Sequence, residues 1–398
     1  MRNVSCKWWP LLVLGVMGSA RASDHLDTPS TIADPAADIG DIYAWMSPDG
    51  RRLNLIMTIV GRRFSDRLQY VFHVDSGPCF AETTATTSIV CRFDAAGAVD
   101  CRAGDADSAR GDAGATAGLE GRNRRFRVFA GLRDDPFFNN VKGVRAALET
   151  AAAALRDGAG RDASGCPAFD RATAQTILDR MRHSGDGPAQ NFLAGWKSSA
   201  LVISIDLGIV NTGGSMLAVW GATYKGGDAR HLGAPIDRAA RALTANALIG
   251  PIAPAEVSDR RKEEYNRAGP AQWPAFAADL EASLPLYDAL DGTCGNQWVS
   301  GREPDGPSRY RLLSRVLADD RLWIDSRFTV CKQYLAVELA QYAEPGASRD
   351  CGGRTPDEDV VDVFRSLLVR GTTTGVSDGV DRDDRVHSTT EFPFLAAP

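Results

Sequence analysis

The sequence lacks most of the features that identify a class of function directly. Its net charge is -6 and its pI is near 5.5, so it has no basic excess for binding nucleic acid or an anionic membrane. After the N-terminus no apolar run reaches the eighteen or so residues of a membrane-spanning helix, so we expect no transmembrane segment. Phosphate-binding loops, zinc-protease and haem-attachment motifs and the serine-hydrolase elbow are missing. With five histidines, there is also little material for a catalytic triad assembled from distant residues.

What the N-terminus does contain is the pattern of a secretory signal peptide. Arg2 and Lys7 precede an apolar run over residues 8–17, and small residues follow up to Ala22. This order predicts a signal peptide over residues 1–22, cleavage after Ala22, and a periplasmic or extracellular protein. We expect residues 23–398 to form a single domain.

Removal of this leader leaves seven cysteines in an oxidising compartment, which favours disulfides over zinc ligation. A short turn over residues 95–97 would place Cys91 opposite Cys101 across a β-hairpin, at a distance that a disulfide can bridge. The other five cysteines leave one thiol over, and their pairing stays open.

The hydrophobic pattern predicts a β-rich first half and a helical second half. Alternation or β-branched runs indicate strands over residues 41–46, 53–60, 68–74, 126–129, 201–209 and 216–224, the last two joined as a hairpin by Asn211-Thr212-Gly213-Gly214. Residues 103–120 lack such a pattern and are expected to be an exposed excursion. The fold class that we expect is α+β, an antiparallel β-sandwich core with inserted and C-terminal helices.

Helical periodicity predicts helices over residues 141–155 and 171–181, and then over 237–248, 256–267, 273–290, 309–317 and 331–339. Residues 318–325 read as a loop rich in carboxylates. A last helix is expected to begin at Thr355-Pro356 with a capping box and to end at Gly371. The apolar tail 392–395 is expected to dock back on the body.

One segment near the mature N-terminus concentrates carboxylates and an imidazole. Pro29 and Pro35 keep it from being one helix, and such crowded oxygens need a cation or hydrogen-bond donors among them. On the strand 68–74 and just beyond it, alternation puts His73 and Asp75 on one face. We therefore predict a divalent-cation site, calcium ahead of zinc or copper, with ligands from His25, Asp27, Asp38, Asp41, His73 and Asp75.

Several alternatives to this cation site stay open. The acidic residues are also typical turn and cap residues, and His73 with Asp75 is typical of a hydrogen-bonded pair on a solvated face. If the mature chain begins Ser23-Asp24-His25, the amine, two amides and the imidazole would form a square-planar copper or nickel site. His183, His231 and His387 read as loop residues without a special role.

The motifs together resemble a known family. They run almost from the leader to the last residue: Asp24-His25-x-Asp27-x-Pro29, Asp34-Pro35-x-x-Asp38-x-x-Asp41-x-Tyr43-Ala44, Arg133-Asp134-Asp135-Pro136-Phe137-Phe138, Tyr265-Asn266, Ser377-Asp378-Gly379-Val380 and Phe392-Pro393-Phe394-Leu395. In these the chain resembles exported bacterial proteins grouped as domain of unknown function, number forty-three thirty-one. The resemblance implies an exported single-domain protein with a β-rich core and carries no settled activity. The segment 236–241 retains only part of the family's pattern.

The hypothesis that fits these observations best is a non-catalytic exported binding protein for a divalent cation or a small polar ligand. A hydrolase that activates water with Asp27, Asp41, Asp75 and His73, directly or through a metal, is the first alternative. The second alternative is a structural or envelope-assembly protein whose acidic loops only stabilise the fold.

Overall fold

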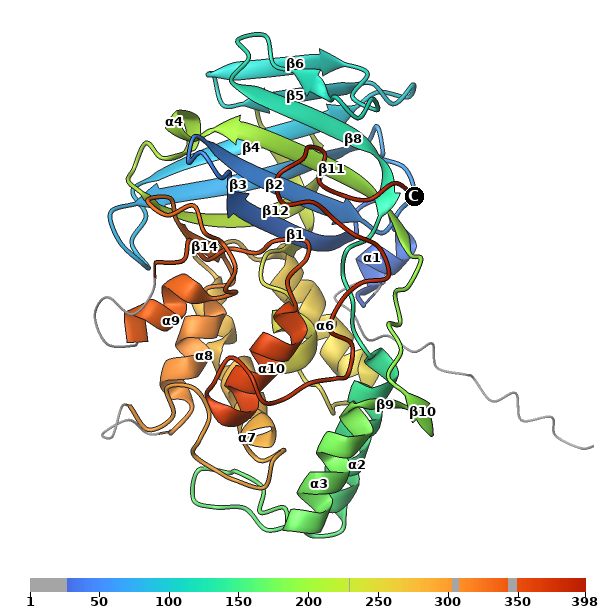
Figure 1. Ribbon diagram of the computed structural model, residues 1–398, viewed down its shortest axis with the longest axis vertical. Coiled ribbons are helices and arrows are strands. Elements are labelled where there is room, and N and C mark those ends of the chain that lie inside the picture. Colours follow the sequence, from blue (N-terminus) through green and yellow to red (C-terminus); the bar gives the residue numbers. More distant parts are fainter. Residues whose placement is uncertain (1–26, 229, 303–307, 343–348) are drawn as a thin grey trace, which may run out of the picture.

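Two antiparallel β-sheets packed face to face form the upper half of the molecule in Figure 1, and the helices gather below them. The computed structural model describes residues 27–228, 230–302, 308–342 and 349–398. The predicted α+β fold with an antiparallel sandwich core is therefore confirmed. The predicted signal peptide, residues 1–22, lies outside the described residues.

The first sheet has the strand order β1-β2-β11-β8-β7. Its inner face is set by period-two alternation, since Leu53, Leu55 and Met57 of β2 belong to the main core whereas Ile56 belongs to a separate outer cluster. The bounds are β1 (Ile39–Met46), β2 (Arg52–Ile59), β11 (Lys197–Asp206), β8 (Phe126–Asp134) and β7 (Leu119–Glu120).

The second sheet has the order β13-β12-β3-β4-β5-β6, with β14 paired to the beginning of β12. Cys91 lies directly opposite Cys101 and forms a disulfide with it at a Cα–Cα distance of 4.1 Å, which confirms that prediction. The bounds are β13 (Leu232–Ala239), β12 (Met216–Gly227), β3 (Leu68–Gly77), β4 (Ala85–Phe93), β5 (Val99–Ala103), β6 (Asp107–Gly111) and β14 (Leu322–Asp325).

The predicted hairpin between residues 201–209 and 216–224 is wrong. β11 pairs with β2 and β8 in the first sheet, while β12 pairs with β3 in the second. The one-turn helix α4 (Leu207–Val210) and the loop 211–214 carry the chain from one sheet to the other. Gly213 and Gly214 are needed here for close approach to the backbone of Ser76 and Gly77, not for a hairpin turn.

Three shorter predictions are also corrected. Residues 103–120 contain β6 and β7, residues 237–239 end β13 instead of beginning a helix, and residues 322–325 form β14 instead of a loop. Residues 103–120 were missed because a buried polar residue, Asp107, stands where an apolar residue would have completed a strand pattern. The carboxylate of Asp107 accepts the backbone N–H groups of Ser108, Asn123 and Arg125.

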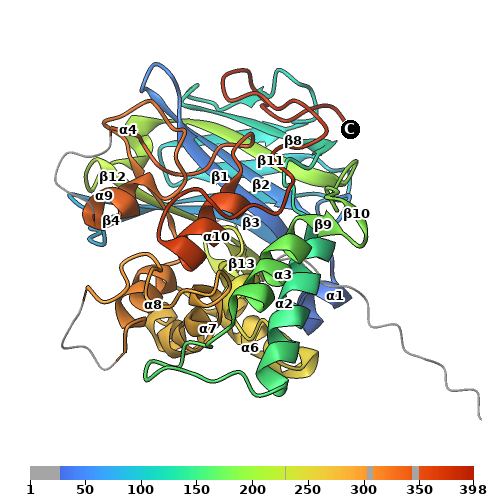
Figure 2. The same ribbon diagram turned by 60° about the horizontal axis from the view of Figure 1, so that its bottom comes forward.

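The helices cover one side of the sandwich, and Figure 2 shows α2 and α3 side by side as an antiparallel pair. The predicted helix 171–181 is confirmed with the same bounds. The predicted helix 141–155 is also confirmed, and the observed helix ends one residue later. The bounds are α1 (Pro29–Ala33), α2 (Val141–Arg156), α3 (Arg171–Met181), α5 (Thr244–Leu248), α6 (Ala255–Arg267), η1 (Trp273–Phe276), α7 (Ala277–Asp288), α8 (Arg311–Ala318), α9 (Ala336–Tyr342) and α10 (Val360–Arg370), and a small ribbon joins β9 (His183–Ser184) to β10 (Gly187–Pro188). No described helix is long and apolar enough to cross a membrane.

The last helix begins later than predicted. Asp359, not Thr355, caps α10 by accepting the backbone N–H of Asp362. The buried carboxylate of Glu358 accepts the backbone N–H groups of Tyr334 and Thr355 ahead of this helix. The helix does end at Gly371, which adopts φ +68°.

The C-terminal part of the chain closes the sandwich. Residues 351–354 bridge the two sheets, since Arg354 pairs with Ala44 of β1 and Gly352 pairs with Ile324 of β14. The tail then covers the outer face of the first sheet, where the ring of Phe394 lies 4.8 Å from that of Trp45. This confirms the predicted docking of the tail.

Candidate functional site

In the structure, two of the predicted ligands of the N-terminal segment, Asp27 and Asp41, lie beside cations. His25 lies outside the described residues. Asp27 lies 3.5 Å from the Nζ of Lys262, and Asp41 pairs with the guanidinium of Arg354. Burial raises the pKa of Asp41 to about 7, although Arg354 opposes this shift. Asp38 is fully buried at the start of β1.

His73 and Asp75 do lie on one face of β3, but that face is covered by protein instead of solvent. The two ring nitrogens of His73 lie 3.0 Å from Ser88 Oγ and 3.0 Å from Tyr224 Oη, and its ring stacks on Trp220. Burial lowers the pKa of His73 to about 4, so the ring is neutral at physiological pH. Both ring nitrogens are engaged within the sheet.

Asp75 is held separately from His73. It accepts the Thr86 hydroxyl at 2.6 Å and pairs with Arg321 at 3.0 Å. Asp27, Asp41 and Asp75 thus have three different cationic partners. The structure does not gather the predicted ligands into one cluster, and the divalent-cation site and the hydrolase alternative stay predictions.

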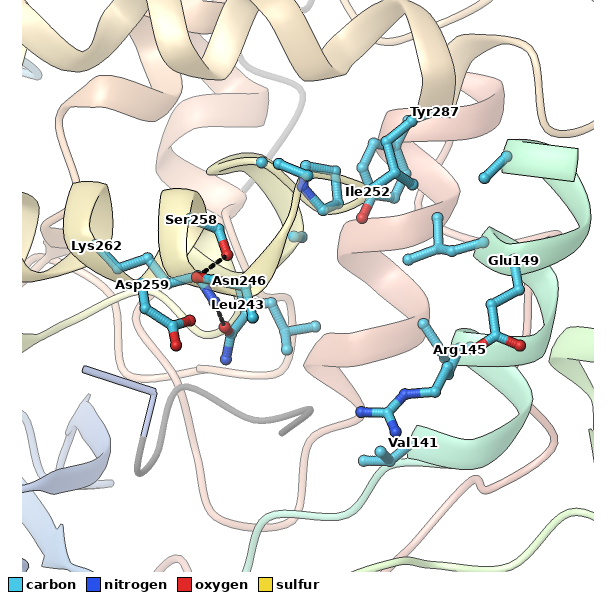
Figure 3. Close-up of a pocket in the computed structure, with 18 of the residues that line it drawn as sticks. Val141, Arg145, Glu149, Leu243, Asn246, Ile252, Ser258, Asp259, Lys262 and Tyr287 are labelled. Carbon is cyan, nitrogen blue, oxygen red and sulfur yellow. Dashed lines mark hydrogen bonds between the residues drawn. The ribbon is translucent and has the colours of Figure 1, made fainter. Parts of the chain in front are cut away.

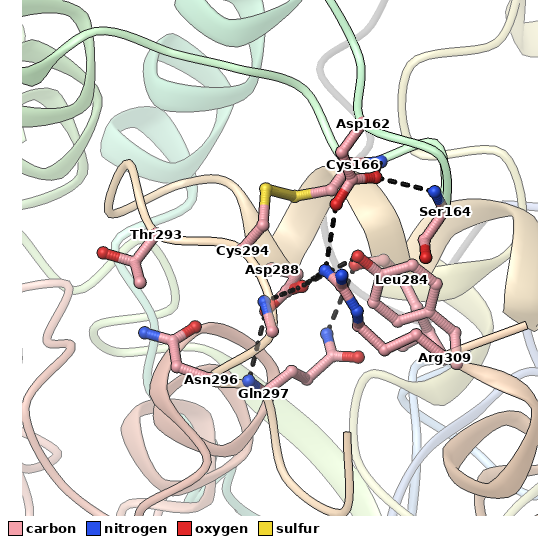
Figure 4. Close-up of polar contacts among 12 residues, drawn as sticks. Asp162, Ser164, Cys166, Leu284, Asp288, Thr293, Cys294, Asn296, Gln297 and Arg309 are labelled. Carbon is pink, nitrogen blue, oxygen red and sulfur yellow. Dashed lines mark hydrogen bonds and ion pairs between the residues drawn. A yellow bond between two sulfur atoms is a disulfide. The ribbon is translucent and has the colours of Figure 1, made fainter. Parts of the chain in front are cut away.

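Among the described residues, three other groups have ligand atoms within 4.8 Å of one another. The first, Asp162 with Cys166 and Cys294, is disqualified as a metal site because the two sulfurs form a disulfide (Figure 4). Beside it the buried carboxylate of Asp288 accepts the Tyr310 hydroxyl at 2.7 Å and the N–H groups of Gly295 and Gln297 (Figure 4). The disulfide ties the loop after α7 to the α2–α3 connection, and the bonds to Asp288 hold that loop against the end of α7.

The second group joins the tail to β8. His387 Nε2 lies 3.2 Å from Asp383 and 3.7 Å from Asp134. The other ring nitrogen accepts the Ala396 N–H at 3.2 Å, so the proton of the neutral ring is on Nε2 and points to the carboxylates. A metal-binding histidine donates through its second nitrogen, so this group is a latch for the tail and not a metal site.

Electrostatics in this latch favour the protonated form of Asp134. Burial and the neighbouring Asp383 raise the pKa of Asp134 to about 6. His387, expected to be an ordinary loop residue, is buried and ties down the C-terminus.

The third group, Asp359, Asp362 and Asp381, is partly exposed at the beginning of α10. Asp359 caps the helix by accepting the Asp362 N–H, and Asp362 accepts the N–H of Asp378. These bonds account for two of the three carboxylates as local turn and cap groups.

A cavity of about 820 Å³ lies between α2 and α6. We call it the α2–α6 pocket. Figure 3 shows α2 forming one wall, with Arg145 and Glu149 on it, and α6 with the preceding loop forming the other. Its apolar surface comes from Val141, Val144, Leu148, Ala152, Leu243, Ala247, Pro251, Ile252, Ala253 and Tyr287.

Lys262 gives the α2–α6 pocket a buried positive charge. This residue is 8% exposed, and its ammonium donates to Asn246 Oδ1 and lies beside Asp27. Carboxylates of Glu149, Glu256 and Asp259 lie elsewhere on the lining. Through Asp27, the acidic N-terminal segment borders this pocket, but His73 and Asp75 do not line it.

A second cavity of about 820 Å³ lies between η1, α7 and α8. Trp273 and several alanines form its apolar part, and Arg311 and Arg315 lie one turn apart on its wall. Arg311 is half-buried and Arg315 is exposed. The third lining arginine, Arg321, has a side chain only 11% exposed, and it pairs with the carboxylates of Asp75 and Asp319.

The sequence analysis missed the α2–α6 pocket, although one signal pointed to it. α2 has two apolar faces: Gly143, Ala147 and Ala151 are buried, whereas Val144 and Leu148 stay partly exposed along the pocket. An apolar surface wider than one core-facing stripe predicts that a helix is covered on more than one side, and here its second face lines a cavity. Lys262, in a charged stretch of α6, gave no such signal.

Comparisons with known proteins found no match to this chain among family models, curated proteins or solved structures.

Proposed function

We propose that this chain is a non-catalytic binding protein of the periplasm or extracellular space that holds a small polar ligand in the α2–α6 pocket. The observation that carries this proposal is the buried Lys262 ammonium at the side of a preformed cavity of about 820 Å³. This volume is in the range of small-molecule sites, which combine an apolar lining with a few polar groups.

Two features support binding without catalysis. No histidine or cysteine is among the described residues that line the pocket. The lining hydroxyl of Ser258 donates to the carbonyl of Ala255 at 3.2 Å, and not to a base that would take its proton. A nucleophile needs such a base or a lowered pKa to react.

Three disulfides support the extracytoplasmic location, since such bonds persist in oxidising compartments. They agree with the leader pattern of the sequence.

A ligand screen with a pocket-blocking variant tests this proposal. Ala152→Phe adds a ring to the α2 wall, whereas Ala153→Phe makes the same change on the next residue, which does not line the pocket. We expect small polar compounds that raise the melting temperature of the wild type and of Ala153→Phe to have no effect on Ala152→Phe. Hits that stabilise all three proteins equally, or a screen without hits, would refute the proposal.

A further inference from the structure

We infer that the ligand of the α2–α6 pocket is a linear amphiphile, with an alkyl chain along α2 and a carboxylate head at Lys262. This inference rests on the proposed function and adds the class of ligand to it.

The shape of the α2 wall favours a chain. Val141, Val144, Leu148 and Ala152 follow one another at intervals of three or four residues and form one continuous row along α2. At 1.5 Å per residue this row is about 16 Å long. Across the pocket it faces Leu243, Ile252 and Tyr287 (Figure 3). A long apolar row between two helices matches an extended alkyl chain that carries the polar group of the ligand at one end.

Most of this row keeps some solvent-exposed surface, although Val141 is buried and Val144 and Leu148 also pack against the main core. Val144, Leu148 and Ala152 are each only partly buried, and Ile252 on the opposite wall is 46% exposed. An alkyl chain would remove this surface from water, which is worth roughly a fourfold gain in affinity for each buried methylene.

Lys262 selects the head group. An ammonium has three N–H donors, and Asn246 and Asp27 account for two of them. The third donor of a nearly buried cation favours an anionic acceptor. The guanidinium of Arg145 extends from the opposite wall, α2, into the space between the walls (Figure 3).

Titration calorimetry on the purified, delipidated full chain tests the inference with dodecanoate, dodecanol, dodecyl phosphate and butanoate, all below their aggregation concentrations. We expect one dodecanoate to bind per chain, at least tenfold more tightly than dodecanol, and butanoate to bind more weakly than dodecanoate by more than a hundredfold. Dodecyl phosphate binding more tightly than dodecanoate would overturn the assignment of a carboxylate head.

Variants separate the head from the chain. Lys262→Met is expected to weaken dodecanoate at least tenfold and to leave dodecanol unchanged, while Lys142→Met, an exposed lysine on α2 outside the pocket, changes neither. Should Lys262→Met fail to fold, Leu148→Asn on the partly exposed wall is expected to weaken dodecanoate and dodecanol alike. Unchanged dodecanoate affinity in the folded variants would overturn the inference.

The same data distinguish this inference from the proposed function. If Ala152→Phe abolishes the response to a compact polar compound but no alkyl carboxylate binds the wild type, only the amphiphile is refuted. If neither kind of compound binds, both proposals fall.

Discussion

Arg354 contacts residues from two separate sequence motifs. It pairs with Asp41, and its guanidinium lies 4.1 Å from the ring centre of Tyr43 and 5.3 Å from that of Phe137. The motif residues near the N-terminus and those of residues 133–138 thus meet at an arginine that the sequence analysis did not select. Their spacing along the chain gave no indication of this shared partner.

Replacing Arg354 by Met is expected to lower the free energy of unfolding by about 3–5 kcal/mol, because it leaves the Asp41 carboxylate buried without its cation. The double variant Arg354→Met/Asp41→Asn is expected to recover part of this loss, since no unpaired charge remains. Urea unfolding of the wild type, both single variants and the double variant measures the coupling. Strictly additive effects would contradict the pairing.

Asp134 makes stability depend on pH. Its pKa in the folded protein, about 6, exceeds the ordinary value of 3.8, so the folded state holds this proton more tightly than the unfolded chain. Its contribution is present below about pH 4 and is lost as the pH rises through 6. We expect Asp134→Asn to become more stable relative to the wild type by about 1–3 kcal/mol between pH 4 and pH 7. A difference that does not change with pH would contradict the raised pKa of Asp134.

At the scale of elements, the crossover after β11 decides how the two sheets are connected. A Cβ on Gly214 would lie 2.1 Å from the carbonyl oxygen of Gly77, and Gly214 has φ +147°. The contact between the loop 211–214 and the end of β3 therefore requires glycine. A hairpin between β11 and β12 would not bring these segments together.

Gly214→Ala is accordingly expected to destabilise the fold by several kcal/mol, about 2 or more, because backbone atoms must move apart. Gly160→Ala is a matched control, since its added Cβ would meet nothing within 4 Å and its φ is not positive. It should change the free energy of unfolding by less than about 0.5 kcal/mol. Chemical denaturation of the two variants measures both values, and equal stability would argue against the crossover.

For the whole molecule, the cysteines give a count that also tests export. Three disulfides use six of the eight cysteines, and Cys79 is exposed and free. If the leader with Cys6 is removed, alkylation under denaturing conditions without reductant should label one thiol, and after reduction seven. Intact-mass spectrometry of the protein from its native compartment gives both numbers. Two labelled thiols before reduction would indicate that Cys6 is retained.

The sequence by itself determined the strands with clear alternation, the helices α2 and α3, the Cys91–Cys101 disulfide and the α+β class. These follow from local periodicity and turn chemistry, which act between residues close in the chain. It also identified Asp27, Asp41, His73 and Asp75 as unusual, and each of them is buried with a polar or charged partner.

Only the tertiary structure decided which groups meet. Asp27 meets Lys262, Asp41 meets Arg354, and Asp75 meets Arg321, each pair more than two hundred residues apart in sequence. Likewise, the α2–α6 pocket exists because α2 and α6, which are far apart in the sequence, flank the same cavity. Burial and pairing at such separations depend on packing of the whole chain, so no local pattern can specify them.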